Sequence, residues 1–171
     1  GRECTPFWGT VWPAAKCLAR FIRDKKILLK NKTVLDFGCG SGIVSIASAM
    51  HGASRVIAND IDPVALHIAR KNFKANSVEI ETESGNLLNQ PLNDSFDLIF
   101  VVDMFYEQHT SELLLKFLLE QIKLGAEVII SDANRPFTPK ARSALLFKEE
   151  LEVDKELEGV SRRTVKIMKL Q

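Results

Sequence analysis

The sequence predicts a doubly wound α/β fold with a mainly parallel sheet, and three observations support this prediction. Short apolar strands alternate with amphipathic helical segments along most of the chain, which is the pattern of parallel strands joined by crossover helices. The run 96–102 is almost continuously apolar, as in a strand covered on both faces. The first strand ends in Asp36, and three alternate glycines up to Gly42 then lead into a helix, as in nucleotide-binding α/β folds.

One domain is expected over residues 1–171, because this length suits a single complete core. No apolar run approaches the ~20 residues that cross a bilayer. The net charge of +1, without a basic stripe, argues against a large nucleic-acid footprint. The three cysteines (Cys4, Cys17 and Cys39) cannot all pair, which favours reduced thiols in an intracellular compartment. No His shows metal-ligand spacing, so we expect no metal.

Helical spacing and turn residues predict the elements of the first half of the chain. Asp62 followed by Pro63 is typical of an N-cap with proline at the first helical position, and Gly52 is typical of a helix end. The expected elements are a helix from Trp12-Pro13 to about Lys26, a strand ending at Asp36, a helix from Ile43 to near Gly52, a strand over 55–60 and a helix from Pro63 to about Phe73.

The second half continues the alternation and then changes character. The expected elements are a strand over 78–83, a strand over 96–102, a helix over 111–124 with a broad leucine face for the core, a strand over 127–131 and a helix from Thr138-Pro139 to about Glu150. Segments 151–157 and 163–168 alternate like an antiparallel pair joined through Glu158-Gly159, which would close the sheet.

The turn from Asp36 to Gly42 has the properties of a nucleoside-binding loop. Glycine adopts positive φ and approaches a ligand closely, and the following helix offers N–H groups to an anion. The spacing is Gly-x-Gly-x-Gly, and Asp36 would repel the pyrophosphate of a dinucleotide. S-adenosylmethionine resolves this conflict, because its ammonium and sulfonium can face Asp36 while its carboxylate meets backbone N–H groups. We predict this cofactor.

Further cofactor contacts are expected where the other parallel strands end. Asp60 lies 18 residues after Gly42, near the spacing at which an acid accepts both ribose hydroxyls. Asn86 has the donor and acceptor to read adenine, and a turn role explains it nearly as well. Trp8 or Trp12 can cover the adenosine or the substrate, with core packing as the alternative. The predicted cofactor site comprises Trp12, Asp36, Gly38, Cys39, Gly40, Asp60, Ile61 and Asn86.

Asp103 and Tyr106 follow the strand over 96–102 and are the candidate catalytic residues. Methyl transfer to lysine needs the neutral amine, and a pKa of about 10.4 leaves roughly one lysine in 2,500 neutral at pH 7. A carboxylate of ordinary pKa, about 3.9, is too weak a base to take this proton. Asp103 is therefore expected to bind and orient the amine, and Tyr106 to add a hydrogen bond or cation–π contact. Phe105 between them is expected in the core.

Four segments together resemble the seven-β-strand protein lysine methyltransferases. They are Pro6-Phe7-Trp8-Gly9-Thr10-Val11-Trp12-Pro13, the Asp36 to Gly42 turn, Asn59-Asp60-Ile61-Asp62-Pro63 and Asp103-Met104-Phe105-Tyr106. Within this family the chain is most similar to the subgroup that methylates the beta subunit of the electron transfer flavoprotein. The resemblance implies a Rossmann-like seven-stranded sheet in the order 3-2-1-4-5-7-6, a protein substrate and a mitochondrial matrix location. Without it, a cytoplasmic location would be expected.

The chain departs from the family pattern at two places. After the strand over 127–131 it reads Asp132-Ala133-Asn134-Arg135-Pro136 where the family has Asp-Pro-Gly-Arg-Pro, so Asp132, Arg135 and Pro136 alone correspond. The family also carries an N-terminal extension, which we expect to be missing from this single methyltransferase domain.

Other functions remain open at this point. A nucleic-acid or glutamine methyltransferase would have Asn/Asp-Pro-Pro-Tyr after the fourth strand, and Met104-Phe105 supplies neither proline. Methylation of a ribosomal protein or a small-molecule amine fits the cofactor turn equally well. A non-catalytic subunit that retains the cofactor fold is a further alternative, although the presence of Asp36, Asp60 and Asp103 together argues against it.

Overall fold

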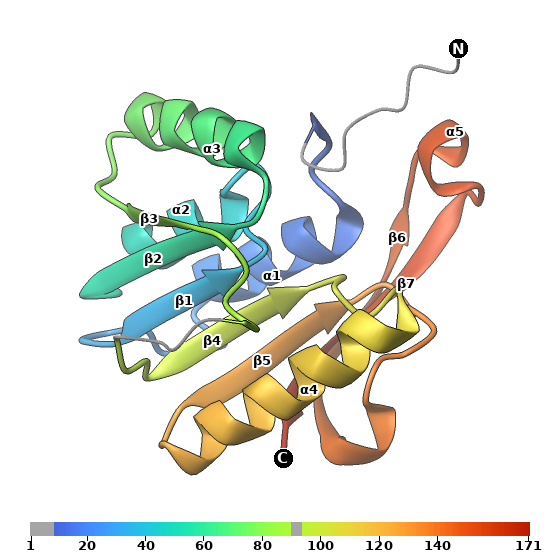
Figure 1. The fold of residues 1–171 in the computed structure, drawn as a ribbon. Coiled ribbons are helices and arrows are strands. Elements are labelled where there is room, and N and C mark those ends of the chain that lie inside the picture. The colour runs from blue at the N-terminus through green and yellow to red at the C-terminus, as the bar shows by residue number, and fades with distance from the viewer. Residues whose placement is uncertain (1–8, 90–93) are drawn as a thin grey trace.

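A computed structural model describes residues 9–89 and 94–171 of the chain, and it places seven strands of these residues in one sheet (Figure 1). The strand order is β3-β2-β1-β4-β5-β7-β6, which confirms the predicted order. Strands β1 to β5 pair in parallel with their neighbours, whereas β7 is antiparallel to both β5 and β6. The elements are α1 (Pro13–Arg23), β1 (Thr33–Phe37), α2 (Ile43–Met50), β2 (Arg55–Asp60), α3 (Pro63–Ala75), β3 (Glu81–Ser84), β4 (Leu98–Val102), α4 (Gln108–Lys123), β5 (Glu127–Asp132), the 3₁₀ turn η2 (Lys140–Arg142), β6 (Ser143–Glu152), α5 (Lys155–Glu158) and β7 (Arg162–Leu170).

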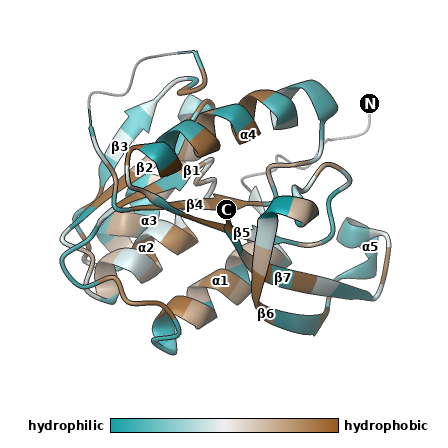
Figure 2. Ribbon diagram, turned by 90° about the horizontal axis from the view of Figure 1, so that it is seen from below, coloured by the Kyte–Doolittle hydropathy of each residue, from teal (hydrophilic) through white to brown (hydrophobic). Residues whose placement is uncertain are grey.

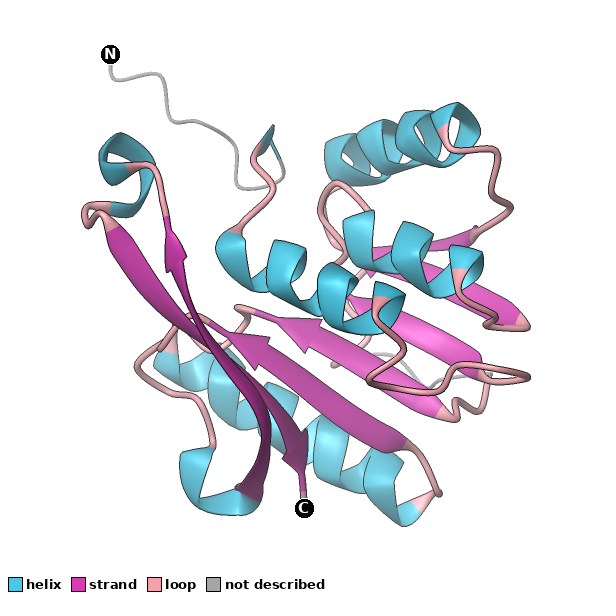
Figure 3. Ribbon diagram, turned by 180° about the vertical axis from the view of Figure 1, so that it is seen from behind, coloured by secondary structure: helices cyan, strands magenta, loops and turns pink. Residues whose placement is uncertain are grey.

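Alternation along the central strands divides the core between the two faces of the sheet. Leu35 and Phe37 of β1 point to the face covered by α4, where Leu114, Phe117 and Leu118 pack. The intervening residues point to the opposite face, which α1, α2 and α3 cover (Figures 1 and 3). Asp36 has this second orientation, so the strand period itself directs its carboxylate towards α2. Figure 2 shows the hydrophobic colour concentrated on the central strands between these layers.

The predicted starts of α1, α2 and α3 and the predicted core residue Phe105 are confirmed. The Asp62 side chain accepts a hydrogen bond from the Val64 N–H at 2.8 Å and so caps α3. Glu107 caps α4 by accepting from His109 and Thr110, so this helix begins three residues before the predicted start. Phe105 is buried in the core under α4.

The helix predicted over 138–150 is wrong, because the structure has only η2 there and then the ten-residue edge strand β6. Ala144, Leu145 and Leu146 are good helix formers and carry little strand signal. Hydrogen bonding to β7 overrides this local preference. The predicted antiparallel pair exists, but its first strand is Ser143–Glu152. Residues 155–157, which were predicted in that strand, instead form the short helix α5 together with Glu158.

The predicted third strand is also shorter than expected, since β3 begins at Glu81 and not at Val78. The Val78 N–H donates to the Phe73 carbonyl at the end of α3, and pairing with β2 begins only at Ile57 and Glu81. Val78 and Ile80 pack beside α3. The apolar part of this segment therefore covers a helix and does not extend the sheet.

Candidate active site at the carboxyl edge of the sheet

The glycine turn is a tight loop between β1 and α2 that needs its glycines for two different reasons. Gly38, Gly40 and Gly42 all have positive φ, at 70°, 52° and 82°, which L side chains rarely adopt. A Cβ on Gly38 would also lie 2.8 Å from the Met104 sulfur, and a Cβ on Gly42 would collide with the Phe73 ring. Gly42 therefore lets α3 pack against the start of α2.

Asp36 lies below this turn, fully buried at the end of β1. Its Oδ2 accepts a hydrogen bond from the Ser45 hydroxyl of α2 at 2.5 Å. Burial raises the pKa of Asp36 to about 6; the Ser45 hydrogen bonds oppose this rise and the Asp60 charge adds to it. A cation beside this carboxyl would recover part of the free energy lost by burying its charge.

Asp60 supports the same turn from the end of β2. Its Oδ2 accepts the Gly40 N–H at 2.9 Å, and its Oδ1 accepts the Asp62 N–H at 3.0 Å. The two acidic residues predicted for the cofactor thus approach the turn from different sides. Asp36 lies beneath it, whereas Asp60 fixes one of its backbone N–H groups.

A small cavity of about 60 Å³ opens on the glycine turn, and we call it the turn cavity. It is lined by residues 10–12 before α1, by the turn itself and by the ends of β1 and β4. Cys39 is buried in its wall, where burial raises the thiol pKa well above its usual range, with further contributions from Asp36 and Asp60. Of the predicted site residues, the cavity brings together Trp12, Asp36, Gly38, Cys39, Gly40 and Asp103.

The remaining predicted site residues do not line this cavity. Ile61 and Tyr106 are exposed, at 72% and 57% of their surface. Asn86 is exposed, and its Oδ1 accepts the Leu88 N–H at 3.0 Å, which is the turn role considered as the alternative. Asp60 contacts the turn from outside. Trp8 lies outside the described residues.

Asp103 is not an open carboxylate, because Arg135 and the backbone already bind both of its oxygens. Its Oδ2 accepts from Arg135 Nη2 at 3.0 Å, and its Oδ1 accepts the Ala133 N–H at 2.8 Å. The Asp103 side chain is 9% exposed, and its φ is 53°. This constrained conformation turns the carboxylate away from β4 towards the loop after β5.

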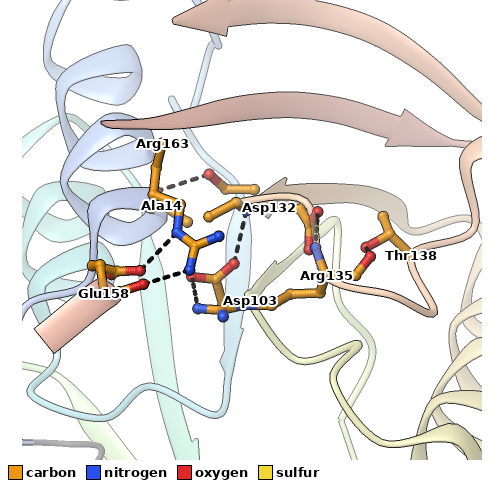
Figure 4. A network of polar contacts seen from close by, with 9 residues as sticks. Ala14, Asp103, Asp132, Arg135, Thr138, Glu158 and Arg163 are labelled. Atoms are coloured by element: carbon orange, nitrogen blue, oxygen red, sulfur yellow. Dashed lines mark hydrogen bonds and ion pairs between the residues drawn. The ribbon is translucent and has the colours of Figure 1, made fainter. Parts of the chain in front are cut away.

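Arg135 belongs to a set of charged side chains that we call the acid–arginine cluster: Asp103, Asp132, Arg135, Glu158 and Arg163 (Figure 4). Asp132 and Glu158 are buried, and the other three are partly buried. Burial lowers the pKa of Arg135, but its hydrogen bond and charge interaction with Asp103 raise that pKa overall. Burial raises the pKa of Asp132. Within residues 9–89 and 94–171, every buried side-chain polar atom without a hydrogen-bond partner lies in this cluster: Asp132 Oδ1, Arg135 Nε and Glu158 Oε1.

Sequence reasoning assigned no role to Ser45, Arg135 or Glu158. Ser45 lies nine residues from Asp36 and becomes its partner only because α2 folds back over β1. Arg135 follows β5 at the same sheet edge as Asp103, and its correspondence to the family pattern was a usable signal. Glu158 was placed in a hairpin turn, and no local pattern indicated that its side chain is buried.

Comparisons with known proteins agree with this architecture. The family model for ribosomal protein L11 methyltransferase (PrmA) matches residues 15–131. The electron transfer flavoprotein beta subunit lysine methyltransferase of Xenopus laevis is 38% identical over 132 residues, covering 76% of this chain and 53% of that protein. The chain spans about half the length of the curated relatives it matches.

Two solved structures show the same fold. The ribosomal protein L11 methylase of Lactobacillus delbrueckii subsp. bulgaricus superposes with a TM-score of 0.64 at 20% identity, covering 99% of this chain and 92% of that chain. The magnesium protoporphyrin IX methyltransferase of Synechocystis, solved with bound SAM, superposes with a TM-score of 0.63 at 16% identity, covering 90% of this chain and 77% of that chain.

Helices long and apolar enough to cross a membrane are not found in the part of the chain that the structure describes.

Proposed function

Since this chain belongs to the ribosomal protein L11 methyltransferase (PrmA) family, we propose that it is an S-adenosylmethionine-dependent protein-lysine N-methyltransferase acting on the electron transfer flavoprotein beta subunit. The observation that carries the proposal is the 38% identity to a lysine methyltransferase named for that substrate, over 76% of this chain. The substrate of that relative also supports a mitochondrial matrix location. Residues 1–171 then form one methyltransferase domain.

The residues of the turn cavity fit the proposed cofactor. Asp36 is a buried carboxyl with a raised pKa, so it favours a cationic ligand such as the ammonium or sulfonium group. Gly38 and Gly40 let the backbone approach closely, and α2 starts without a side-chain cap, which leaves its N-terminus for the carboxylate. When bound, S-adenosylmethionine supplies an electrophilic methyl group.

The volume of the turn cavity indicates which part of the cofactor it can enclose. About 60 Å³ is far below the roughly 300–1,000 Å³ of a site that encloses a whole small molecule. The methionine end is therefore proposed to occupy the cavity beside Trp12, Asp36 and Cys39. The adenosine would lie along Asp60, Ile61 and Asn86 at the open ends of β2 and β3.

Asp103 and Tyr106 are proposed to hold the acceptor amine. Each carboxylate oxygen has two acceptor sites, so Asp103 keeps capacity beyond its bonds to Arg135 and Ala133. Arg135 offsets part of its charge, so we assign Asp103 to orienting the amine after its proton has left to water. Tyr106, at the exposed rim, would contact the substrate surface.

Methylation of a ribosomal protein is the second candidate, because the matching family model is described by that activity. The two candidates differ in the protein substrate and share the cofactor site. A labelling assay separates the two candidates. The protein is incubated with labelled methyl donor and, in turn, purified folded electron transfer flavoprotein, ribosomal protein L11, free lysine and a panel of RNA and DNA. We expect label on the flavoprotein beta subunit. Preferential labelling of L11 or of nucleic acid would overturn the assignment.

The variant Asp103→Asn separates chemistry from cofactor binding. It deletes the charge near the amine, and loss of one such contact costs about 2.7–4 kcal/mol, or 100- to 1000-fold in rate, whereas donor affinity should stay within about twofold. Single-turnover methylation and donor titration on the same sample test this expectation.

Asp97→Asn is the matched control, because this exposed aspartate precedes the same strand at its opposite end. Near-normal turnover of Asp103→Asn would remove Asp103 from the mechanism. A parallel collapse of donor binding would move it to the cofactor site.

A further inference from the structure

We propose, resting on the function above, that a second cavity beside α1 receives a lysine side chain of the protein substrate that neighbours the acceptor lysine, and that Glu158 is a specificity-determining residue that binds its ammonium group. This cavity has a volume of about 220 Å³ and lies between the start of α1 and the end of the β6–α5–β7 hairpin. We call it the hairpin cavity. Figure 3 shows the hairpin reaching past the ends of the central strands beside α1.

The hairpin cavity has the shape and wall of a site for one long side chain. Its volume is below the range of sites that enclose a whole small molecule, about 300–1,000 Å³. Val11 and Pro13 from one side and Leu151 and Val153 from the other form an apolar wall. The charged residues of the lining are Lys16, Arg20, Glu152, Asp154 and Glu158, so the acids outnumber the bases by one. A lysine stem of four methylene groups buries well against such surface while its charged end seeks a polar partner.

Glu158 supplies that partner. Its side chain is only 4% exposed, and its Oε2 accepts from Arg163 Nε at 3.0 Å. Its second oxygen, Oε1, is buried without any hydrogen-bond partner, although the residue lines the cavity. A buried oxygen of this kind is costly unless a donor completes it. The last torsion of glutamate is broad, so a small rotation turns this oxygen towards an ammonium group.

The hairpin cavity also adjoins the proposed transfer site. Thr10 and Val11 line both it and the turn cavity, so the two meet at the segment before α1. The acid–arginine cluster also links the two cavities electrostatically. The Glu158 charge acts on Arg135, and Arg135 forms an ion pair with Asp103 in the wall of the turn cavity. A lysine held by Glu158 would therefore lie beside the acceptor lysine that Asp103 is proposed to orient.

The test is steady-state methylation of folded electron transfer flavoprotein by Glu158→Gln. We expect the KM for the protein substrate to rise about tenfold or more, the effect of losing one hydrogen bond to a charged group, with kcat and donor Kd within twofold. Glu156→Gln is the matched control, because Glu156 lies on the same short helix and is exposed. An unchanged KM, or an equal loss of donor affinity, would overturn the proposal.

A second variant keeps the test decisive if Glu158→Gln does not fold. Val153→Trp fills the hairpin cavity without touching the acid–arginine cluster, and we expect it to raise the same KM at unchanged donor Kd. A normal KM for this variant would also overturn the proposal.

The proposed function is tested separately by wild-type turnover. If the wild type methylates no lysine, n-butylamine, a mimic of the lysine side chain, is titrated into it by NMR. Shifts at Val11 and Val153 that are lost in Glu158→Gln would support the cavity assignment, and their absence in the wild type would refute it.

Discussion

Asp36 is a buried acidic residue whose charge lowers the stability of the folded state. The strand period directs its carboxyl into the α2 layer, where Ser45 is its hydrogen-bond partner. Burial raises its pKa to about 6 from an ordinary value of 3.8. The folded state therefore holds a proton that the unfolded state releases at lower pH.

This pKa predicts a pH dependence of stability with a definite sign. The contribution of Asp36 is fully present below about pH 4 and is lost as pH rises through about 6, a change of about 3 kcal/mol at about 1.36 kcal/mol per pKa unit. Urea unfolding of the wild type and Asp36→Asn from pH 4 to 7 measures it. The contributions of the other carboxyls cancel when the unfolding free energies of the two proteins are subtracted. As pH rises, the variant should become more stable relative to the wild type. Parallel curves would contradict the assignment.

Gly42 is the residue at which the glycine turn and helix packing meet. Gly42→Ala is expected to lose about 2–4 kcal/mol, because it adds strain at positive φ to a collision with the Phe73 ring. Gly159→Ala is the matched control, since Gly159 has a φ of 72° and open space around it; it should cost about 1 kcal/mol. Chemical denaturation of both variants measures the difference, and equal losses would rule out the collision.

Among the elements, β6 departs most from its local sequence preference. Its half-buried residues Phe147, Glu149 and Leu151 alternate with exposed neighbours, which is the period of a strand. Phe147 contacts the Phe21 ring of α1 at a centroid distance of 5.7 Å, and Glu149 pairs with Arg20 at 2.6 Å. The hairpin is thereby attached to α1, which forms the other wall of the hairpin cavity.

The strand register predicts unequal costs for neighbouring truncations in β6. Phe147→Ala should lose about 2 kcal/mol, less than the 3–5 kcal/mol of a fully buried ring, because it removes packing on Phe21 and the Lys26 ammonium, 4.0 Å from the ring centroid. Leu146→Ala should lose under about 1 kcal/mol, since Leu146 is 45% exposed. Urea denaturation compares the two, and the reverse order would contradict this register.

At the scale of the whole molecule, the candidate site residues lie along one edge of the sheet. The glycine turn after β1, Asp60 after β2, Asp103 after β4 and the Asp132 to Arg135 loop after β5 all lie at the carboxyl ends of parallel strands. The β6–β7 hairpin adds Glu158 from the antiparallel side. Of these five parts of the chain, the glycine turn, Asp103 and Glu158 line the two cavities. Asp60 and Arg135 support them through hydrogen bonds to Gly40 and Asp103.

Binding of the proposed cofactor should stabilise this whole arrangement. At 100 times its Kd, a ligand that binds only the folded state adds about 2.7 kcal/mol, which corresponds to a Tm increase of about 5–11 °C for a domain of this size. Thermal melts with S-adenosylmethionine and with NAD measure it. We expect the increase with the first ligand only; a larger increase with NAD would contradict the cofactor assignment.

The sequence by itself determined the mainly parallel α/β alternation, the glycine turn, the cap at Asp62 before Pro63 and the positions of Asp36 and Asp60. These features depend on residues a few positions apart, or on the strand and helix periods, so they can be read along the chain. The resemblance to known methyltransferases added the strand order of the sheet and the proposed protein substrate.

Only the tertiary structure decided the conformation of residues 143–150 and the partners of the buried charges. β6 is a strand because β7 pairs with it, and Asp103 meets Arg135 across 32 positions of sequence. Glu158 lines a cavity because the hairpin folds beside α1. Such contacts join segments far apart in the chain, and their energies outweigh local preference, so no local pattern in the sequence could have specified them.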